Sequence, residues 1–476
     1  PWWAIGASLI AANISAEQII GMSGQGFVVG MAIAVWELTA AIALIVMAKF
    51  FLPLFLEKKI YTMPQFLEQR FDKRVSLVLS FFWLTVYIFV NLTAVLWLGS
   101  LAINTLTGMS LVNGMILLAF LSLAYSLSGG LKAVAMTDIV QVVLLIFGGL
   151  AVSYIALTKI GDGSITTGMV QVYQQMPEKF DMILSPDNPS YNNLPGIWIL
   201  IGAGVWIGHF AYWGFNQYIT QRALGAKSLK EAQKGVMFAA YLKLLMPLVI
   251  VLPGICAAIL FPVLDKTDQA YPTMMIELLP SGLLGLTFAA LIAAIVSSLA
   301  SMTNSISTIF TMDICRSFSK NEIQQSSLIL IGRSAVVGSM LIALVMAKPI
   351  LGNSDQIFQY IQNFTGLFTP GILVIFLVAL FWKKATALSV LVAAILSVVM
   401  SIFIQASFPD FPYIHRMGVV FFASGMGCYL TSLAQGYLDQ EKAIDLNGIN
   451  FKTSKAFNVN SLIIVSILTL IYVTLG

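Results

Sequence analysis

Long apolar runs separated by short polar segments constrain the fold of this chain more than any other feature. A helix that crosses a bilayer needs about 20 mainly apolar residues, and about thirteen segments of the chain meet this requirement. The expected spans are 3–22, 29–52, 76–103, 109–127, 133–157, 196–220, 235–262, 282–312, 326–347, 356–382, 386–405, 415–437 and 458–475. The sequence therefore predicts an all-α, polytopic membrane protein with a single transmembrane domain over residues 1–476.

The composition leaves little material for a soluble domain. Charged residues make up 10% of the chain, against roughly 25% in an ordinary soluble domain, and 59% of the residues are hydrophobic. These values exclude a soluble globular chain, a disordered chain and a nucleic-acid-binding protein. The 3 cysteines and 2 histidines are scattered, so the sequence indicates no disulfide framework, metal cluster or nucleophile–base pair. We expect a protein that is not an enzyme.

The basic residues orient the chain, because cytoplasmic loops carry an excess of Lys and Arg. If the first span starts in the cytoplasm, 19 of the 25 basic residues lie in inside loops, 5 lie outside and Lys243 falls within a span. Segment 60–72 is short and amphipathic, which is typical of a helix at the membrane interface. Segments 158–195 and 438–457 are the longest polar loops.

Polar residues interrupt two spans at corresponding positions. The run Asn13–Gln18 lies inside the first span, and Trp206–His209 lies inside the sixth. A repeat of five helices inverts its orientation, and paired interruptions in inverted halves indicate a transporter binding site near the bilayer midplane. The alternative is a pair of ordinary kinks whose polar groups are satisfied by neighbouring helices. A third irregularity is expected in the tenth span, where Gly366 and Pro370 predict a kink.

Few ionisable residues remain inside the spans, and such residues are functional by default because they are expensive to bury. They are Glu17, Glu37, Asp138 and Lys243, with Asp313 near the end of a span. Lys243 and Glu37 carry opposite charges. Each could offset the cost of burying the other's charge, or both could hydrogen-bond a polyhydroxylated ligand. The alternative is a purely structural ion pair.

Amide, aromatic and methionine side chains recur at helical spacing around the interruptions. Residues three or four positions apart share one face of a helix. This spacing relates Gln18 to Met22, Phe358 to Gln362, and His209 to Tyr212 and Trp213. Such a set suits a sugar, whose hydroxyls take hydrogen bonds and whose C–H surfaces pack on rings. For any single aromatic residue, core packing or contact with lipid is the simpler interpretation.

The eighth span contains Ala294, Ser297 and Ser298 on neighbouring faces. Their carbonyl and hydroxyl oxygens are hard ligands of the kind sodium prefers, and free carbonyls at the first interruption are able to complete the set. Small residues also pack helices together in membranes, and the pattern alone favours that second interpretation.

Six stretches of the chain resemble the sodium/solute symporter family, and in particular its bacterial galactose-carrying members. They are PWWAIGASLIAANISAEQ (1–18), YWGFNQYITQR (212–222), AYLK (240–243), AAIVSSLASM (293–302) with IFTMDI (309–314), and FQYIQNFTGLFTPGI (358–372). The resemblance implies a leucine-transporter-like fold with broken helices 1 and 6 and inverted repeats at 1–157 and 196–382, followed by additional helices over 386–476. It also implies fourteen helices in the full-length protein, the first of which would precede Pro1.

The resemblance also implies roles for individual residues. Sugar binding is implied for Gln18, Glu37, His209, Tyr212, Trp213, Lys243 and Gln362, and an outer hydrophobic gate is implied for Met22, Trp36 and Phe358. A sodium site is implied at the carbonyls of Ala11, Ile14 and Ala294 and the hydroxyls of Ser297 and Ser298, with Asp138 on the sodium exit route. This reverses the interpretation that the serine pattern favours by itself.

Two positions depart from the galactose-carrying members, in which a serine stands at Ala40 and an asparagine at His209. The identity of the sugar is therefore open. Ala300 replaces a hydroxyl that relatives with a second sodium use, while Ser301 remains, which favours one sodium per cycle. The expected function is sodium-coupled uptake of a galactose- or glucose-like monosaccharide by alternating access.

The alternatives are a symporter of the same family for inositol, sialic acid or proline, and a passive uniporter or channel. The expected location is the plasma membrane, the inner membrane if the source is bacterial. The expected partners are the sugar, sodium and the lipid bilayer, with no nucleic acid and no obligatory protein partner.

Overall fold

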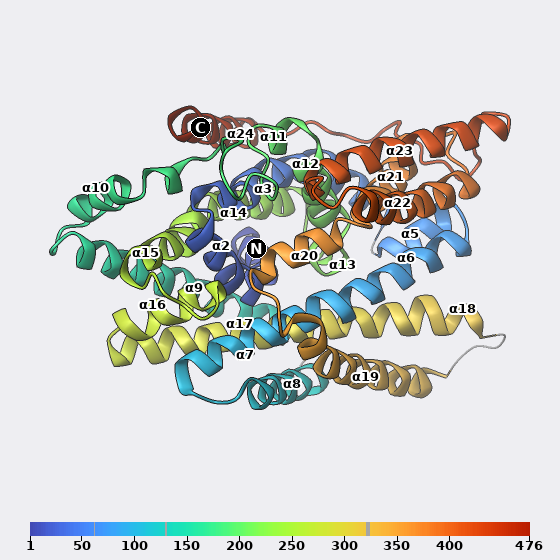
Figure 1. The fold of residues 1–476 in the computed structure, drawn as a ribbon. Coiled ribbons are helices and arrows are strands. Elements are labelled where there is room, and N and C mark those ends of the chain that lie inside the picture. Colours follow the sequence, from blue (N-terminus) through green and yellow to red (C-terminus); the bar gives the residue numbers. More distant parts are fainter. Residues whose placement is uncertain (61, 129–130, 320–323) are drawn as a thin grey trace.

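The computed structural model describes residues 1–60, 62–128, 131–319 and 324–476, and only the backbone of residues 128 and 131–138. Every regular element in this part of the chain is a helix (Figure 1). Nine of the described helical stretches are long and apolar enough to cross a membrane, and the number reaches 11 if each of two bent pairs counts as one span. The chain is thus a multi-pass helical membrane protein, and the number thirteen stays a prediction.

The spanning stretches follow the predicted segments closely. They are Met31–Glu57 (η2, α3, η3 and α4), Lys73–Thr107 (α6, η4 and α7), Ile139–Ile160 (within α9, Leu131–Ile160), Leu229–Leu260 (α14, η7 and α15), Ser281–Phe318 (α17, η9 and α18), Gln325–Leu351 (α19), Ala387–Ser407 (α22), Tyr413–Ala434 (α23) and Lys455–Leu475 (α24). The bent pairs are α1 (Trp2–Asn13) with η1 and α2 (Glu17–Val28), and α20 (Ile357–Thr365) with α21 (Thr369–Phe381).

Shorter helices fill the remaining segments. They are α5 (Met63–Arg70), α8 (Leu111–Ser128), α10 (Ile165–Gln175), η5 (Pro177–Phe180), α11 (Trp198–Ile201), α12 (Gly204–His209), η6 (Phe210–Gly214), α13 (Gln217–Leu224), η8 (Thr267–Gln269) and α16 (Ala270–Leu278). The predicted loop 158–195 therefore contains the helix α10. The predicted interfacial helix at 60–72 corresponds to α5, whose Arg70 donates to the carbonyls of Ala379, Trp382 and Ala385 at 3.2, 3.1 and 3.3 Å.

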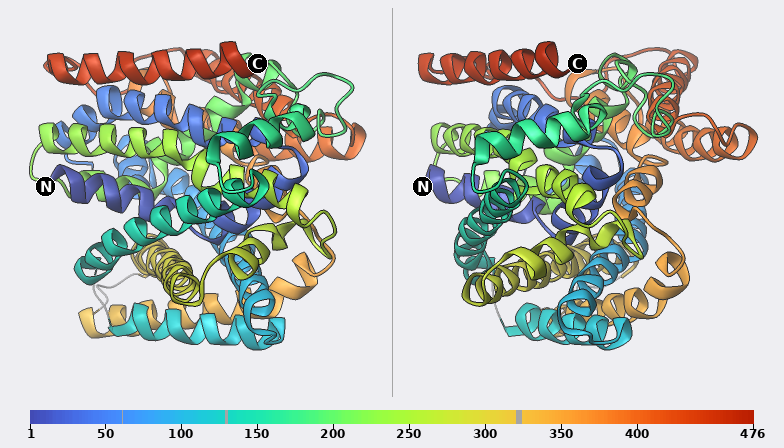
Figure 2. Two further views of the ribbon diagram at one scale, coloured as in Figure 1. Left: turned by 90° about the vertical axis from the view of Figure 1, so that its left-hand side faces the viewer. Right: turned by 60° about the vertical axis from the view of Figure 1, so that its left-hand side comes forward.

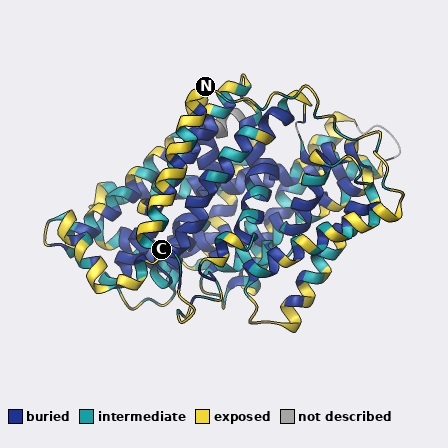
Figure 3. Cartoon of the chain, turned by 90° about the horizontal axis from the view of Figure 1, so that it is seen from above, coloured by how far each residue is buried: buried dark blue, intermediate teal, exposed yellow. Residues whose placement is uncertain are grey.

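The helices surround a continuous buried core, with the first broken helix near its centre. Seen from above, buried residues fill the middle of the molecule and exposed ones mark its rim (Figure 3). Helix α24 lies along the outside, against α3 and α14 (Figure 2). Its outer side chains, including Leu470 and Val473, are exposed and apolar, as expected for a surface in contact with lipid.

Two of the three predicted irregularities lie where the sequence places them. The first span bends by 66° between Asn13 and Glu17, and the tenth bends by 47° between Thr365 and Thr369. The prediction for the sixth span is wrong in position, because Trp206 to His209 are helical within α12. The chain leaves the helix before them, at Ala203 with φ 68°, and after them, at Phe215 with φ −133°.

The physical reason is that side chains satisfy the backbone before α12. The indole nitrogen of Trp206 donates to the Leu200 carbonyl at 2.6 Å, which supplies a donor where the short helix α11 ends. Gly204 then packs on the Ile414 carbonyl, where an added Cβ would approach to 2.3 Å. The polar residues of the sequence therefore predicted that this span is irregular, but they did not predict the residue at which the helix breaks.

Six described segments are wound as π-helical turns, namely η1 (Glu17–Met22), η3 (Met47–Phe51), η4 (Tyr87–Leu92), η6 (Phe210–Gly214), η7 (Pro247–Val251) and η9 (Ile309–Cys315). Such turns are rare and are frequent at functional sites, because the extra residue changes which side chains face a neighbour. Three of them, η1, η4 and η6, contribute the side chains of the cavity described next.

Candidate functional site

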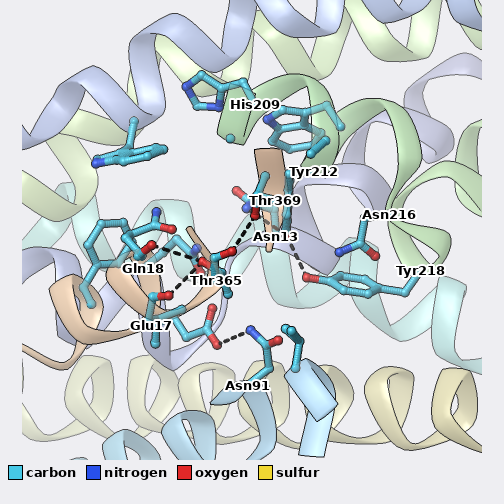
Figure 4. Close-up of a pocket in the computed structure, with 18 of the residues that line it drawn as sticks. Asn13, Glu17, Gln18, Asn91, His209, Tyr212, Asn216, Tyr218, Thr365 and Thr369 are labelled. Carbon is cyan, nitrogen blue, oxygen red and sulfur yellow. Dashed lines mark hydrogen bonds between the residues drawn. The ribbon is translucent and has the colours of Figure 1, made fainter. Parts of the chain in front are cut away.

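A cavity of about 130 Å³ lies where the break of the first helix meets η4, η6, α3, α14 and α20 (Figure 4). It is lined by Asn13, Glu17, Gln18, Met22, Trp36, Glu37, Phe82, Trp83, Val86, Asn91, Gly208, His209, Ala211, Tyr212, Trp213, Asn216, Tyr218, Lys243, Phe358, Ile361, Gln362, Thr365, Thr369, Ile372 and Met417. All seven residues predicted for sugar binding and all three predicted for the outer gate are in this set. The structure therefore brings together side chains that are separated by more than 300 positions in the sequence.

An ion pair lies at the wall of this cavity. The ammonium of Lys243 lies 2.6 Å from the Glu37 carboxylate, and the two side chains are 1% and 3% exposed. Lys243 also donates to the Asn13 side-chain oxygen, at the end of α1, and its nitrogen lies 5.3 Å from the centre of the Trp213 ring. A buried charge is tolerated only when it is paired and hydrogen-bonded, so this set joins α3, α14 and the first helix break.

The break itself directs polar groups into the cavity. Ile14 has extended backbone (φ −80°, ψ 107°), so α1 ends there. The backbone N–H of Ser15, which an unbroken helix would direct to the Ala11 carbonyl, donates to the Gln18 side chain at 3.3 Å. The second predicted amide, Gln362, enters from α20. Thr365 and Thr369 line the cavity at the kink that follows (Figure 4).

Apolar side chains close one side of the cavity. Met22, Trp36 and Phe358 are all buried and come from η1, α3 and α20. Gly21 permits this packing, because an added Cβ there would lie 3.1 Å from the Cβ of Phe358. The three residues for which the resemblance implies an outer gate are therefore buried together at the cavity, and their role as a gate stays a prediction.

A cluster of tyrosines closes the other side. The hydroxyl of Tyr212 accepts from Asn13 at 3.2 Å and lies 2.9 Å from the hydroxyl of Tyr218. Tyr87 donates to Asn216 at 2.9 Å in the same layer. Further along, Arg222 donates to Ser8 on α1 and to Ser301 on α17, the latter at 3.4 Å. These contacts tie η6 and α13 to the first and eighth spans beneath the cavity.

His209 is hydrogen-bonded to Thr39 on α3. Its Nε2 lies 2.8 Å from the Thr39 hydroxyl, which is also hydrogen-bonded to the Val35 carbonyl. A neutral ring that donates from Nε2 to this hydroxyl presents Nδ1 as an acceptor, whereas the other tautomer accepts at Nε2. The ring also packs edge-on against Trp36, with centroids 5.5 Å apart. Ala40, the second departure from the galactose-carrying members, is fully buried and lies outside the lining set.

The structure adds polar residues that the sequence analysis did not assign to the site. Glu17 is the most important of them, and its carboxylate accepts from Asn91 on η4 at 3.3 Å (Figure 4). Asn216, Tyr218, Thr365 and Thr369 also line the cavity. Glu17 could have been assigned to the site from the sequence, because it is a carboxylate within a predicted span. Asn91 could not, because the sequence does not show that it lies on a π turn.

The five residues predicted for sodium are all buried, on two helices that pack together. Ala11 and Ile14 lie at the break of α1, and Ala294, Ser297 and Ser298 lie on α17. The Ser298 hydroxyl has no hydrogen-bond partner among the described residues. A buried polar atom normally has a partner, so this oxygen fits a cation ligand. The Asp138 side chain lies outside the part of the chain that the structure describes.

A buried carboxylate connects the loop that contains η8 to α2 and α20. Asp268 on η8 is 1% exposed and accepts from the backbone N–H of Ile357, the first residue of α20, at 3.0 Å. Its other oxygen has no partner among the described residues, and an added Cβ at Gly24 on α2 would approach that oxygen to 2.6 Å. Burial is the main cause that raises the pKa of Asp268 to about 7, and the nearby Asp355 carboxylate raises it further. The Ile357 hydrogen bond and the Lys266 ammonium act in the opposite direction and lower it.

Comparisons with known proteins agree with this geometry. The fold and the enclosed site define a helical membrane transporter. The model of the sodium:solute symporter family matches residues 1–388, and the chain belongs to that family. It is 45% identical to a sodium/glucose cotransporter of Vibrio parahaemolyticus, over 99% of this chain and 90% of the relative.

Other relatives are more distant, and one of them has a name that states a different solute. An uncharacterized symporter, YidK, of Escherichia coli is 35% identical over 82% of this chain and 69% of its own length. A human sodium/myo-inositol cotransporter 2 is 30% identical over 80% of this chain, which spans 60% of that protein.

Solved structures share the fold at low sequence identity. A sodium-coupled sialic acid symporter in a substrate-bound, outward-open state matches with a TM-score of 0.77 and 22% identity, over 91% of this chain and 90% of its own. Mhp1, a nucleobase-cation-symport-1 family transporter, matches with a TM-score of 0.55 and 15% identity, over 97% and 95%.

The Lys243–Glu37 pair gives a first prediction. Lys243→Met should lower the free energy of unfolding by roughly 3–5 kcal/mol, because it leaves the Glu37 carboxylate buried and unpaired. Adding Glu37→Gln removes that charge and should restore most of the loss. The measurement is thermal unfolding of the purified protein in detergent. Equal instability of the single and double variants would show that the charge is not the cause.

The Asp268 loop gives a second prediction, on pH. Asp268 stays protonated in the closed loop up to about pH 7 but loses its proton near pH 4 when it is exposed. Closure is therefore strongest below about pH 4, weakens as the pH rises from 4 to 7, and changes little above 7. Each pH unit between about 4 and 7 changes the closing equilibrium by up to about tenfold. Hydrogen exchange of residues 352–358, corrected for its intrinsic pH dependence, should rise between pH 5.5 and 7.

Asp268→Asn should abolish this dependence and keep the closed state, since an amide oxygen still accepts from Ile357. Asp265→Asn, at an exposed position of the same loop, is the matched control and should keep the dependence. A pH response that survives in Asp268→Asn would assign it to another group.

Proposed function

We propose that this chain is a sodium-coupled symporter that carries a neutral, hexose-like sugar through the cavity. The observation that carries the proposal is the balance of groups in that cavity. Among the described lining residues Lys243 is the one cation, and it is already paired with Glu37. Glu17 adds a further carboxylate. An anionic solute such as sialic acid, or the carboxylate of proline, would meet no unpaired cation among the described lining residues.

The remaining lining residues suit hydroxyl groups. Gln18, Gln362 and Asn91 offer both donors and acceptors, and Glu37 offers acceptors that align with hydroxyl hydrogens. The Tyr212 and Trp213 rings supply faces for the C–H surface of a sugar ring. Of the two positions that depart from the galactose-carrying members, His209 lines the cavity, where it substitutes an imidazole for an amide, while Ala40 is buried outside the lining. The change at His209 fits a hexose or polyol whose hydroxyl pattern differs from that of galactose.

We further propose that sodium binds between the first helix break and α17. Carbonyls of Ala11, Ile14 and Ala294 with the hydroxyls of Ser297 and Ser298 would link the two segments and favour the outward-open arrangement, which orders Gln18 at the sugar. Coupling requires that sodium bind the two arrangements with different affinity. A membrane potential contributes roughly 2.3 kcal/mol per charge per 100 mV to inward movement. The proposed stoichiometry is one sodium per sugar.

Alternating access supplies the remaining steps. Met22, Trp36 and Phe358 occlude the sugar from outside, and separation of the layer of Tyr212 and Tyr218 releases it inside. Residues 1–157 and 196–382 form the two inverted repeats in this proposal, and their relative movement opens each side in turn. Asp138 is the proposed relay on the sodium exit route.

Uptake into proteoliposomes tests the function. With an inward sodium gradient, labelled glucose, galactose or myo-inositol should accumulate above the external concentration, while sialic acid and proline should not. An equal potassium gradient is the control and should give no accumulation. The Lys243→Met/Glu37→Gln protein should be folded but inactive. Accumulation of only an anionic solute or proline, or equal flux without sodium, would contradict the proposal.

The sodium site has its own prediction. Ser298→Ala should abolish sodium-dependent uptake, because it deletes one of the hydroxyl ligands from a buried site. Ser305→Ala is the matched control on the same helix, since its hydroxyl is already bonded to the Ser301 carbonyl at 3.1 Å, and it should transport normally. Uptake with unchanged sodium dependence in Ser298→Ala would place the ion elsewhere.

A further inference from the structure

A further cavity, of about 650 Å³, is lined by both polar and apolar side chains and lies apart from the cavity described above. Helices α8, α17 with η9 and α18, and α19 form its walls (Figure 1). Its lining residues are Ser126, Leu127, Asn304, Ser307, Thr308, Thr311, Met312, Arg316, Gln325, Leu328, Ile329, Gly332, Arg333 and Val336. None of them lines the transport cavity, so this site is independent of the proposed substrate.

Two arginines give this cavity its charge. Arg316 and Arg333 come from different helices, are both exposed, and make neither an ion pair nor a hydrogen bond with the described residues. No acidic residue belongs to the described lining. The nearby carboxylate on η9, Asp313, is buried in the protein. Two free guanidinium groups at one cavity favour an anion that presents several oxygens, because each guanidinium offers a planar fork of donors.

The interior of the cavity offers hydroxyl and amide groups. Thr311 is buried, and its hydroxyl has no partner among the described residues. Ser126 donates to the side-chain oxygen of Asn304 at 2.8 Å, which fixes the orientation of that amide. Gly332 allows α19 to approach, since an added Cβ would lie 2.7 Å from the Ser307 hydroxyl and 3.4 Å from that of Thr311.

The rim of the cavity is apolar and faces outward. Leu127, Ile329 and the adjacent Leu330 are 41%, 53% and 67% exposed. The stretch Ser281–Phe318 has 38 residues and is therefore about 57 Å long, longer than the roughly 30 Å hydrocarbon layer. The stretch therefore extends beyond the hydrocarbon layer, and its end at Arg316 has apolar side chains close to the two arginines in sequence and at the same cavity.

We propose that this cavity binds the phosphodiester headgroup of an anionic phospholipid. The guanidinium groups of Arg316 and Arg333 hold the phosphate oxygens, Thr311 donates its hydroxyl, and the acyl chains lie along Leu127, Ile329 and Leu330. Basic pockets between transmembrane helices on the cytoplasmic side bind such headgroups, and the distribution of Lys and Arg places this end inside. A bound lipid links α8, α17 and α19 at a point where the two arginines have no partner among the described residues.

Lipid titration of the purified full-length protein in detergent tests the proposal. Phosphatidylglycerol should raise the midpoint of thermal unfolding and remain bound in native mass spectrometry, whereas phosphatidylcholine should do neither. Arg316→Gln/Arg333→Gln should weaken phosphatidylglycerol binding by roughly ten- to thirtyfold. Thr311→Val should weaken it less. The double variant removes no buried side chain, so its midpoint without lipid should equal that of the unmodified protein.

Two controls define the occupant. Arg74→Gln removes an exposed arginine that already has a partner, Asp72, and should leave lipid binding unchanged. Inorganic phosphate at millimolar concentration should produce no comparable shift, because it lacks acyl chains. Equal responses to both phospholipids, unchanged lipid binding in the double arginine variant, or a full response to phosphate alone would each overturn the proposal.

Discussion

Buried charge in a medium without water is the constraint on which this structure depends. An isolated ammonium or carboxylate in the bilayer is costly, and Lys243 and Glu37 are held at 2.6 Å, with Asn13 as a further acceptor for the ammonium. Asn13 is the last residue of α1, so the same interaction that neutralises the pair also fixes the point at which the first helix breaks. The cavity exists because this break, α3 and α14 are held together.

The breaks and π turns follow from the same constraint. In lipid, backbone groups must be satisfied internally, and irregular backbone is tolerated only where it meets protein or a cavity. The Ser15 N–H donates to the Gln18 side chain, and the Leu200 carbonyl accepts from the indole N–H of Trp206. Polar side chains therefore replace the missing helical partners. The π turns η1, η4 and η6 then direct Glu17, Asn91 and Tyr212 to one point. Regular α-helices of the same sequence would direct some of these side chains elsewhere.

Charged side chains outside the cavity act in different ways. Asp268 and its loop connect α2 to α20, whose residues Phe358 and Gln362 border the cavity. Elsewhere, Arg222 ties α13 to Ser8 and Ser301, while Arg316 and Arg333 have no partner among the residues that the structure describes. In the proposals above, the paired charges hold the helices around the cavity and the two unpaired arginines bind lipid.

The sequence by itself determined the class of fold, because apolar runs of spanning length allow only helices in a bilayer. It also indicated the working charges, since Lys243, Glu37 and Glu17 stand out against an apolar background, and the resemblance identified every predicted sugar and gate residue that the cavity brings together. Only the tertiary structure decided where the sixth span breaks and that Asn91, Thr365 and Tyr218 join the site. Those features depend on π turns and on contacts between distant helices, and such contacts have no local pattern from which they can be predicted.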